Sequence, residues 1–289
     1  MSALPNITPE DIAVRRIMAN ARDLAVLPQV VFKIMDLTGG ENPASASALE
    51  RAILVDPGFS ARILTQANSA YFALPRKVAS IREATMFVGL KAVRELAMTI
   101  GVFDMFLGKN DRGSLRRRGW WRLSLDAAVT GKAIAPLFST CSMDEAYTCG
   151  LLHCIGKTLM DRTSAEDYTQ VEELVQKGVP DYLAERAIFG CDHLDVNIAA
   201  CRTWGFPENL MSGLEYLHEP VPGAPADHLR AITALSSKIA MLAAEDRNAV
   251  KPELLPDWAL KQLEIPHESI QELVDRGCTA IDEAKHLLR

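Results

Sequence analysis

The sequence lacks a hydrophobic run long enough to cross a bilayer. Its longest stretch without a charged side chain is Ile63–Pro75, 13 residues, whereas a membrane-spanning helix needs about 20 apolar residues. The first residues lack a basic segment followed by an apolar one, so a secretory signal is not expected. None of the six cysteines form a C-x-x-C pair, and without an export signal they are expected to be reduced thiols. The predicted location is the cytoplasm, with no membrane partner.

An excess of basic residues is also missing. The chain has 31 Lys and Arg against 37 Asp and Glu, a formal net charge of −6. This balance argues against a protein that coats DNA or anionic membranes, because both need a net basic face. No glycine-rich phosphate-binding loop of the P-loop or dinucleotide type is present. The 289 residues, 48% of them hydrophobic, are enough for about two domain-sized units with a core that needs no disulfide or metal.

The alternation of apolar and polar residues that marks β-strands never persists, and the periodicity is helical along most of the chain. Helix starts are indicated at Thr8-Pro9 and Asp56-Pro57, and one helical block is expected over 143–160. We predict an all-α protein with an N-terminal helical lobe, residues 1–111, packed on a second helical lobe, residues 112–289. The polar stretch from Gly108 to Gly113 separates the lobes.

One local string carries more chemical information than the rest of the chain. It reads Gly150-Leu151-Leu152-His153-Cys154-Ile155-Gly156-Lys157. A histidine in an apolar helix is more often a satisfied core residue than a metal ligand. The string nevertheless resembles the G-L-L-H-D-I-G-K signature of HD-domain phosphohydrolases, whose His–Asp pair holds one or two divalent metal ions. Here the position of the aspartate is occupied by Cys154.

A broader resemblance covers residues 25–245. The motifs that carry it, in order, are Leu27-Pro28-Gln29-Val30-Val31, Asp56-Pro57-Gly58-Phe59-Ser60, Ala67-Asn68-Ser69-Ala70-Tyr71-Phe72, Val88-Gly89-Leu90, Gly190-x-Asp192-His193 and Trp204-Gly205-Phe206-Pro207. This chain is similar to the HDOD family, the HD-related output domains. The resemblance implies an all-α domain of bacterial signalling proteins, a degenerate relative of metal phosphohydrolases that serves regulation. Asn68 itself is expected to bond backbone groups near the end of a helix.

The same resemblance implies where a metal site would lie and which ligands are missing. Catalytic relatives have an early histidine where this chain has Leu123, and a final helical aspartate that maps to Ser237, with Ser236 as the alternative. Their His–Asp pair has become His153–Cys154, and Leu217 stands for the first member of a later His–His pair. The histidines that this chain retains are His153, His193 and His218. We expect no metal and no catalytic residue, although Cys154 with His153 and His193 could hold a soft ion such as zinc.

A cluster of basic residues precedes two tryptophans. Arg116, Arg117 and Arg118 lie directly before Gly119-Trp120-Trp121. Such a run can bind a nucleotide phosphate, nucleic acid or an acidic protein surface. It can also be a solvated segment that leads into a core helix. We keep these arginines as a candidate interaction site.

Three functions remain open from the sequence. The leading hypothesis is a non-catalytic module of bacterial signal transduction, with a signalling protein as its partner. Response-regulator output is the typical role, but the 25 residues before the resemblance are too few for a receiver domain, so the chain is expected to be a stand-alone protein or a fragment. The second hypothesis is a metal-dependent phosphohydrolase acting on a cyclic dinucleotide or nucleotide. The third is a nucleotide-sensing or nucleic-acid-binding module, although nucleic acid is the less expected ligand.

Overall fold

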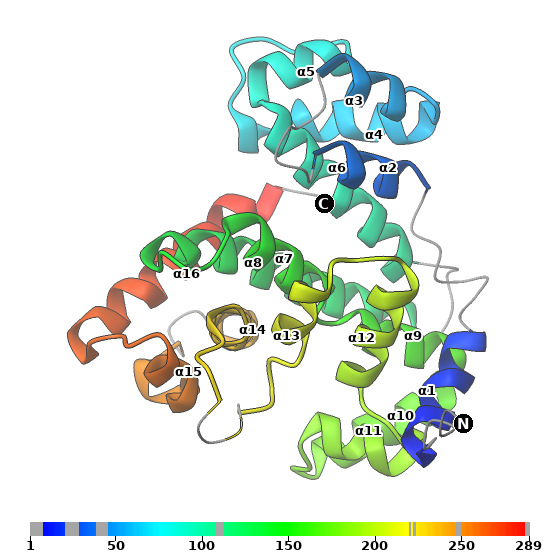
Figure 1. The fold of residues 1–289 in the computed structure, drawn as a ribbon, viewed down its shortest axis with the longest axis vertical. Helices are drawn as coiled ribbons and strands as arrows, with labels where there is room; N and C mark the ends of the chain where they lie inside the picture. Colours follow the sequence, from blue (N-terminus) through cyan, green and yellow to red (C-terminus); the bar gives the residue numbers. More distant parts are fainter. Residues whose placement is uncertain are drawn as a thin grey trace, which may run out of the picture. The chain divides into compact units, whose positions relative to one another are not determined.

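Every regular element that the structure describes is helical (Figure 1). The structure is a computed structural model, and it describes residues 8–20, 29–38, 46–107, 113–219, 221, 224–246 and 250–286. The predicted all-α class is confirmed. Among these residues no helix combines the length and the apolar character that a bilayer crossing requires.

The chain divides into two compact units. The larger unit comprises Met1–Ala25 and Phe106–Ala280, and the smaller comprises Val26–Met105 and Ile281–Arg289. The smaller unit contains α2 (Gln29–Thr38), α3 (Ala46–Ile53), α4 (Pro57–Ala67), η1 (Ala70–Phe72), α5 (Ile81–Val88), α6 (Leu90–Leu107) as far as Met105, and η7 (Ala284–His286).

The larger unit contains the N-terminal helix and the helices of the segment Phe106–Ala280. They are α1 (Pro9–Asn20), α7 (Ser114–Ile134), η2 (Ala135–Leu137), α8 (Met143–Leu152), α9 (Ile155–Thr163), α10 (Ala165–Gln176), α11 (Asp181–Phe189), α12 (His193–Thr203), η3 (Glu208–Leu210), α13 (Met211–Leu214), α14 (His228–Glu245), η5 (Pro252–Leu254), α15 (Asp257–Gln262), η6 (His267–Ser269) and α16 (Ile270–Glu283) as far as Ala280.

The division differs from the predicted one at the N-terminus. Helix α1 belongs to the larger unit, because Ala13 and Ile17 are buried and the helix contacts α9 and α12. Glu10 also forms an ion pair with Arg186 on α11. The predicted division near residue 112 lies among residues 108–112, which fall outside the described residues.

Local sequence explains how the helices of the smaller unit begin. Asp56 caps α4 by accepting a hydrogen bond from the Phe59 amide at 3.0 Å, with Pro57 in the first turn. Ser80 caps α5 in the same way. Gly89 adopts a φ of 88°, which a side chain would strain, and this turn separates α5 from α6. Asn68 both accepts from and donates to the backbone of Val78, as its position near a helix end predicts.

The core of the larger unit is built on α7, which packs against α8 and α14. Gly150 on α8 permits this contact, since a Cβ there would lie 2.6 Å from the Cα of Ala128. The block predicted as one helix over 143–160 is wrong at its centre. Helix α8 ends at Leu152 and α9 begins at Ile155, so His153 and Cys154 occupy a turn between two helices.

A second close approach fixes that turn. A Cβ on Gly156 would lie 2.1 Å from the carbonyl oxygen of His193, so only glycine lets α9 start against α12. The Asn197 amide on α12 donates to the His153 carbonyl at 2.7 Å and accepts from the Gly156 amide at 2.5 Å. These bonds satisfy backbone groups that the break in the helix leaves open.

Candidate functional site

A pocket of about 380 Å³ lies within the larger unit, beside the turn at His153. It collects residues from α7, the α8–α9 turn, α9, the start of α11, the segment after α13, and α14, η5 and α15. The lining residues are Leu123, His153, Cys154, Lys157, Asp181, Tyr216, Leu217, Ala234, Ser237, Lys238, Met241, Leu254, Pro256 and Trp258. Four positions that the sequence assigns to a lost metal site, Leu123, His153, Cys154 and Ser237, therefore meet at one pocket.

The His153 ring is satisfied by hydrogen bonds from its own turn. Its Nδ1 lies 2.6 Å from the carbonyl oxygen of Gly150, which can only accept, so Nδ1 carries the hydrogen. Its Nε2 lies 3.2 Å from the Sγ of Cys154. Burial lowers the pKa of His153 to about 4 and raises the pKa of Cys154 to about 12. At neutral pH the thiol therefore donates to the uncharged ring.

Helix α14 places Ser237, and not Ser236, at the pocket. Ser236 is fully buried in the helix packing, whereas Ser237 is half-buried and lines the pocket. The Ser237 hydroxyl donates to the carbonyl of Ala234 at 3.1 Å. Of the two serine alternatives, Ser237 is therefore the one that lines the pocket.

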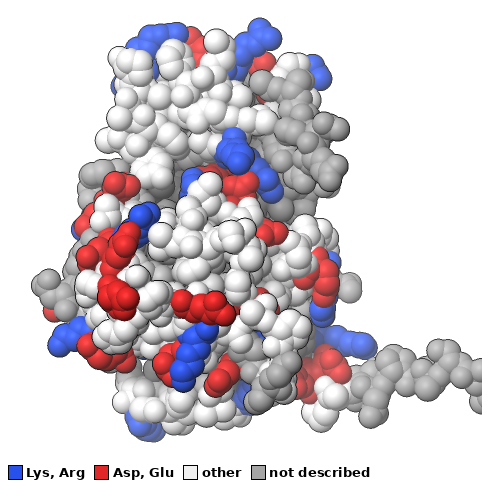
Figure 2. Space-filling view, turned by 60° about the vertical axis from the view of Figure 1, so that its left-hand side comes forward, with Lys and Arg blue, Asp and Glu red and all other residues white. Residues whose placement is uncertain are grey.

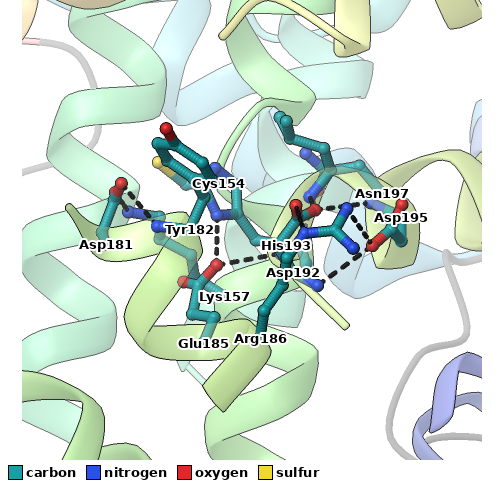
Figure 3. A network of polar contacts seen from close by, with 12 residues as sticks. Cys154, Lys157, Asp181, Tyr182, Glu185, Arg186, Asp192, His193, Asp195 and Asn197 are labelled. Atoms are coloured by element: carbon teal, nitrogen blue, oxygen red, sulfur yellow. Dashed lines mark hydrogen bonds and ion pairs between the residues drawn. The ribbon is translucent and has the colours of Figure 1, made fainter. Parts of the chain in front are cut away.

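Lys157 and Asp181, which both line the pocket, form an ion pair with each other (Figure 3). Burial alone would lower the pKa of Lys157, but the carboxylates of Asp181 and Glu185 outweigh it and raise that pKa. Burial would raise the pKa of Asp181, and Lys157 lowers it well below its usual range. Both groups are charged, and each largely cancels the field of the other. The same pair also lines a neighbouring pocket of about 320 Å³, beside Trp120 and Tyr168.

Behind the pocket, His193 takes part in a buried polar network (Figure 3). Its Nδ1 lies 2.5 Å from the Oε2 of Glu185, which also accepts from the His193 amide at 2.9 Å. Tyr168 donates to the other Glu185 oxygen at 2.6 Å, and Tyr216 lies 3.1 Å from the Nε2 of His193. Burial raises the pKa of Glu185, but His193 and these hydrogen bonds lower it overall. The carboxylate stays charged and fully bonded.

The three retained histidines do not converge. His193 is fully buried, and Tyr216 lines the pocket in its place. His218 is exposed, and its ring centre lies 6.5 Å from that of Tyr182. Leu217, the neighbour that stands for a missing histidine, does line the pocket. Of the three, only His153 is part of the lining.

The HDOD domain family matches residues 24–220 of this chain. The chain belongs to the HDOD family. Its fold is similar to that of an HDOD domain protein from Geobacter sulfurreducens, with 24% identity, a TM-score of 0.79 and coverage of 96% of this chain and 98% of the other. A candidate signal transduction protein from Marinobacter aquaeolei has a TM-score of 0.75 at 18% identity, over 98% of this chain and 66% of its own.

Two further proteins are similar to this chain, one in structure and one in sequence. A candidate phosphohydrolase from Shewanella amazonensis has a TM-score of 0.71 at 21% identity, over 93% of this chain and 97% of its own. An uncharacterized protein of Treponema pallidum is 22% identical over 218 residues, 73% of this chain. The HDOD chain spans about two fifths of the length of that relative, at 41%.

The side chains of this HDOD pocket do not fit a divalent metal ion. Among the described residues no group of three or more His, Cys, Asp or Glu side chains is arranged to hold one. The Nε2 of His153, the ring nitrogen that faces the pocket side of the turn, already accepts a hydrogen bond from the Cys154 thiol at 3.2 Å. A soft zinc site at Cys154 and His153 lacks its third ligand, because His193 lies behind Tyr216.

The arginine run of the HDOD chain is mostly committed to internal contacts. Arg117 is 1% exposed, with Nη1 2.5 Å from Asp161 and Nε 3.1 Å from the carbonyl of Phe106. Arg116 also contacts Asp161, at 3.2 Å, and Glu172, at 2.9 Å. Arg118 is exposed, so it is the member of the trio that a ligand could reach. On the face drawn in Figure 2, acidic and basic side chains are interspersed.

Sequence reasoning missed the polar groups that now occupy the site. Lys157 was visible as the last residue of the His153 string, but its partner Asp181 is 24 residues away on another helix. No local sequence pattern indicates that Glu185 pairs with His193. The two residues are eight positions apart and meet because the chain turns between α11 and α12. The signal that could have found Asp181 is its place directly after Pro180, which is typical of the first turn of a helix, here α11.

Proposed function

We propose that this HDOD protein is a non-catalytic module of bacterial signal transduction that acts by binding another protein. The observation that carries the proposal is the exchange of ligands at the pocket. Leu123, Cys154 and Ser237 line it. The resemblance assigns these three positions to metal ligands of catalytic relatives, and none of the three side chains here supplies a charged oxygen. Its one carboxylate, Asp181, is paired with Lys157.

The same pocket offers no group that would activate water. A bound metal ion lowers the pKa of its water towards neutrality and so generates the nucleophile. Without a metal, hydrolysis needs a free general base whose pKa lies near the working pH. His153 has a pKa of about 4 and both ring nitrogens engaged. Asp181 has its pKa lowered by Lys157 and is therefore a weak base.

An assay of hydrolysis tests the absence of catalysis. The purified protein is incubated with Mn²⁺ and either a cyclic dinucleotide or nucleoside mono- and triphosphates, next to the variant His153→Ala. We expect the same background rate from both proteins. Turnover that depends on Mn²⁺ and disappears in His153→Ala would show that the protein is a phosphohydrolase.

Exposed apolar side chains on the smaller unit support a protein partner. Val55 after α3 and Met86 on α5 are 76% and 77% exposed, and α3 contacts α5. Phe87 is also exposed, with the Arg76 guanidinium 5.1 Å from its ring centre. Large apolar side chains that are exposed at a surface are candidates for contact with another protein.

Capture of partners from the cytoplasm of the native host tests this part of the proposal. The bait is the full chain, compared with Met86→Lys and with the control Leu115→Lys, which changes an equally exposed residue of α7 in the larger unit. We expect the wild type and Leu115→Lys to retain a signalling protein in the same ratio of captured protein to bait. We expect Met86→Lys not to retain it. Equal retention by all three proteins, or by none, would contradict a partner site on the smaller unit.

A further inference from the structure

The pocket beside His153 has largely apolar walls. Leu123, Leu217, Met241, Leu254 and Trp258 contribute side chains from five segments of the larger unit. Its volume of about 380 Å³ lies within the range of small-molecule sites, which are mostly apolar with a few placed polar groups. The walls therefore suit the apolar body of a small molecule.

The charges that line this pocket do not cancel. Lys157 is paired with Asp181, and the Nε2 of His153 lies 3.2 Å from the Sγ of Cys154. The remaining charged group is Lys238 on α14, which is half-buried and lines the pocket. No hydrogen bond or ion pair joins Lys238 to another described residue. Among the residues that the structure describes, the lining thus carries one positive charge without a paired anion.

The ammonium of Lys238 can form a charge-assisted hydrogen bond with an anionic ligand, and this bond is stronger where apolar walls exclude water. We propose that the pocket is a binding site for a small amphipathic monoanion, a carboxylate on an apolar body. The carboxylate pairs with Lys238, and the apolar body lies against Leu123, Met241 and Trp258. This site goes beyond the proposed function, because it holds whether or not the protein binds a partner.

Charge and wall chemistry distinguish this ligand class from a nucleotide. A phosphate monoester carries nearly two negative charges at neutral pH, whereas the lining leaves one positive charge unmatched. A second anionic group would meet the Lys157–Asp181 pair, which offers no unmatched positive charge. A ribose would also place hydroxyl groups against the leucine and methionine walls, where they find few partners. The pocket therefore favours one charge and a large apolar surface.

Octanoate is the probe that tests the site, with 1-octanol as its uncharged counterpart. Binding to the full chain is measured by calorimetry, and the indole N–H resonance of Trp258, assigned with Trp258→Phe, reports the location. We expect octanoate to bind at least about tenfold more tightly than 1-octanol, the size of one charge-assisted hydrogen bond. We expect the Trp258 resonance to shift on titration.

Two variants and a control separate charge from cavity. Lys238→Met is expected to weaken octanoate about tenfold and to leave 1-octanol unchanged. Lys261→Met, an exposed lysine paired with Asp257 and outside the lining, should bind as the wild type does. Leu123→Trp fills the pocket and should abolish binding of both probes.

Three results would overturn the proposal. The first is no octanoate binding, or binding that leaves the Trp258 resonance unmoved. The second is equal octanoate affinity in the wild type and Lys238→Met. The third is tighter binding of adenosine monophosphate than of octanoate, which would assign the pocket to nucleotides. Circular dichroism of each variant confirms that it is folded before binding is compared.

Discussion

At the scale of single residues, Arg117 shows how a basic run can be structural. Its guanidinium is buried against the fully buried carboxylate of Asp161 and the carbonyl of Phe106. Removing one partner of a buried ion pair leaves an uncompensated charge in a region of low dielectric. Two arginines share Asp161, so Arg116 retains part of the compensation when Arg117 is lost.

We expect Arg117→Met to lower the free energy of unfolding by about 3 kcal/mol. Arg118→Met is the matched control, and because Arg118 is exposed it should change stability by less than about 0.5 kcal/mol. Urea unfolding followed by circular dichroism measures both values. Equal effects of the two substitutions would show that Arg117 is not buried.

His153 makes a prediction about pH. Its pKa is about 4 when folded and near 6.5 when unfolded, so the unfolded chain binds the proton first as pH falls. The stability that comes from the neutral ring is complete above about pH 6.5 and is lost between about pH 6.5 and pH 4. Burial raises the pKa of Asp195 to about 7 and gives the opposite trend over part of this window, so a comparison with a variant is needed.

Between about pH 7.5 and pH 5 the wild type should lose about 2 kcal/mol more stability than His153→Gln. Urea unfolding of both proteins at the two pH values gives this difference directly. The same loss in both proteins would mean that the His153 ring is protonated, or solvated, in the folded state.

At the scale of helices, glycines decide where the site can form. Gly156 starts α9 against the backbone of His193, where a Cβ would lie 2.1 Å from the carbonyl oxygen. We expect Gly156→Ala to destabilise the fold by about 1–3 kcal/mol, because the backbones of α9 and α12 must separate. Gly119 on α7 is exposed and has nothing within 4 Å of a Cβ.

Gly119→Ala is therefore the control, and it should stabilise the protein by about 0.5–1 kcal/mol, since alanine is the better helix former. Thermal unfolding of the two variants gives opposite shifts of Tm if the close approach is real. A Gly156→Ala variant that is as stable as the wild type would refute it.

Helix starts were predictable because their causes are local. Ser164 and Asp192 accept hydrogen bonds from amides two or three residues ahead, and their spacing from Asp167 and Asp195 is visible in the sequence. The break at His153 was not predictable. It depends on Asn197, 44 residues away, which bonds the His153 carbonyl. The Lys157–Asp181 pair was missed for the same reason, since no local pattern joins α9 to α11.

The candidate site was predictable where the family motif fixes position and not where packing decides. Leu123, His153, Cys154 and Ser237 meet at the pocket as the motif implies. His193 does not join them, because its ring is buried and hydrogen-bonded to Glu185 and Tyr216. His218 does not join them, because its side chain is exposed at the surface. Burial of Arg117 likewise depends on Asp161, a residue of another helix.

At the scale of the whole molecule, the presence of Leu123, Cys154 and Ser237 in place of metal ligands is expected to let the protein fold without a bound metal ion. Leu123→His, Cys154→Asp and Ser237→Asp together add two acids to the pocket that already holds Asp181. We expect this triple variant to be less stable without metal, because the acids repel one another and lose hydration. Added Mn²⁺ should recover part of the loss, by an amount that grows with the ratio of free metal to Kd.

Thermal unfolding of the wild type and the triple variant, each with a chelator or with Mn²⁺, measures this exchange. The wild-type Tm should be the same under both conditions. A chelator that lowers the wild-type Tm, or Mn²⁺ that leaves the triple variant unchanged, would show that these three positions do not form the former metal site.

Central to the proposed function is that the pocket beside His153 does not bind a metal ion. Its most direct test is the metal content of the protein purified from its native host without chelators, determined by mass spectrometry and compared with His153→Ala. The account predicts far less than one equivalent of Mn, Fe or Zn in both proteins. One equivalent of any of these metals in the wild type, lost in His153→Ala, would contradict it.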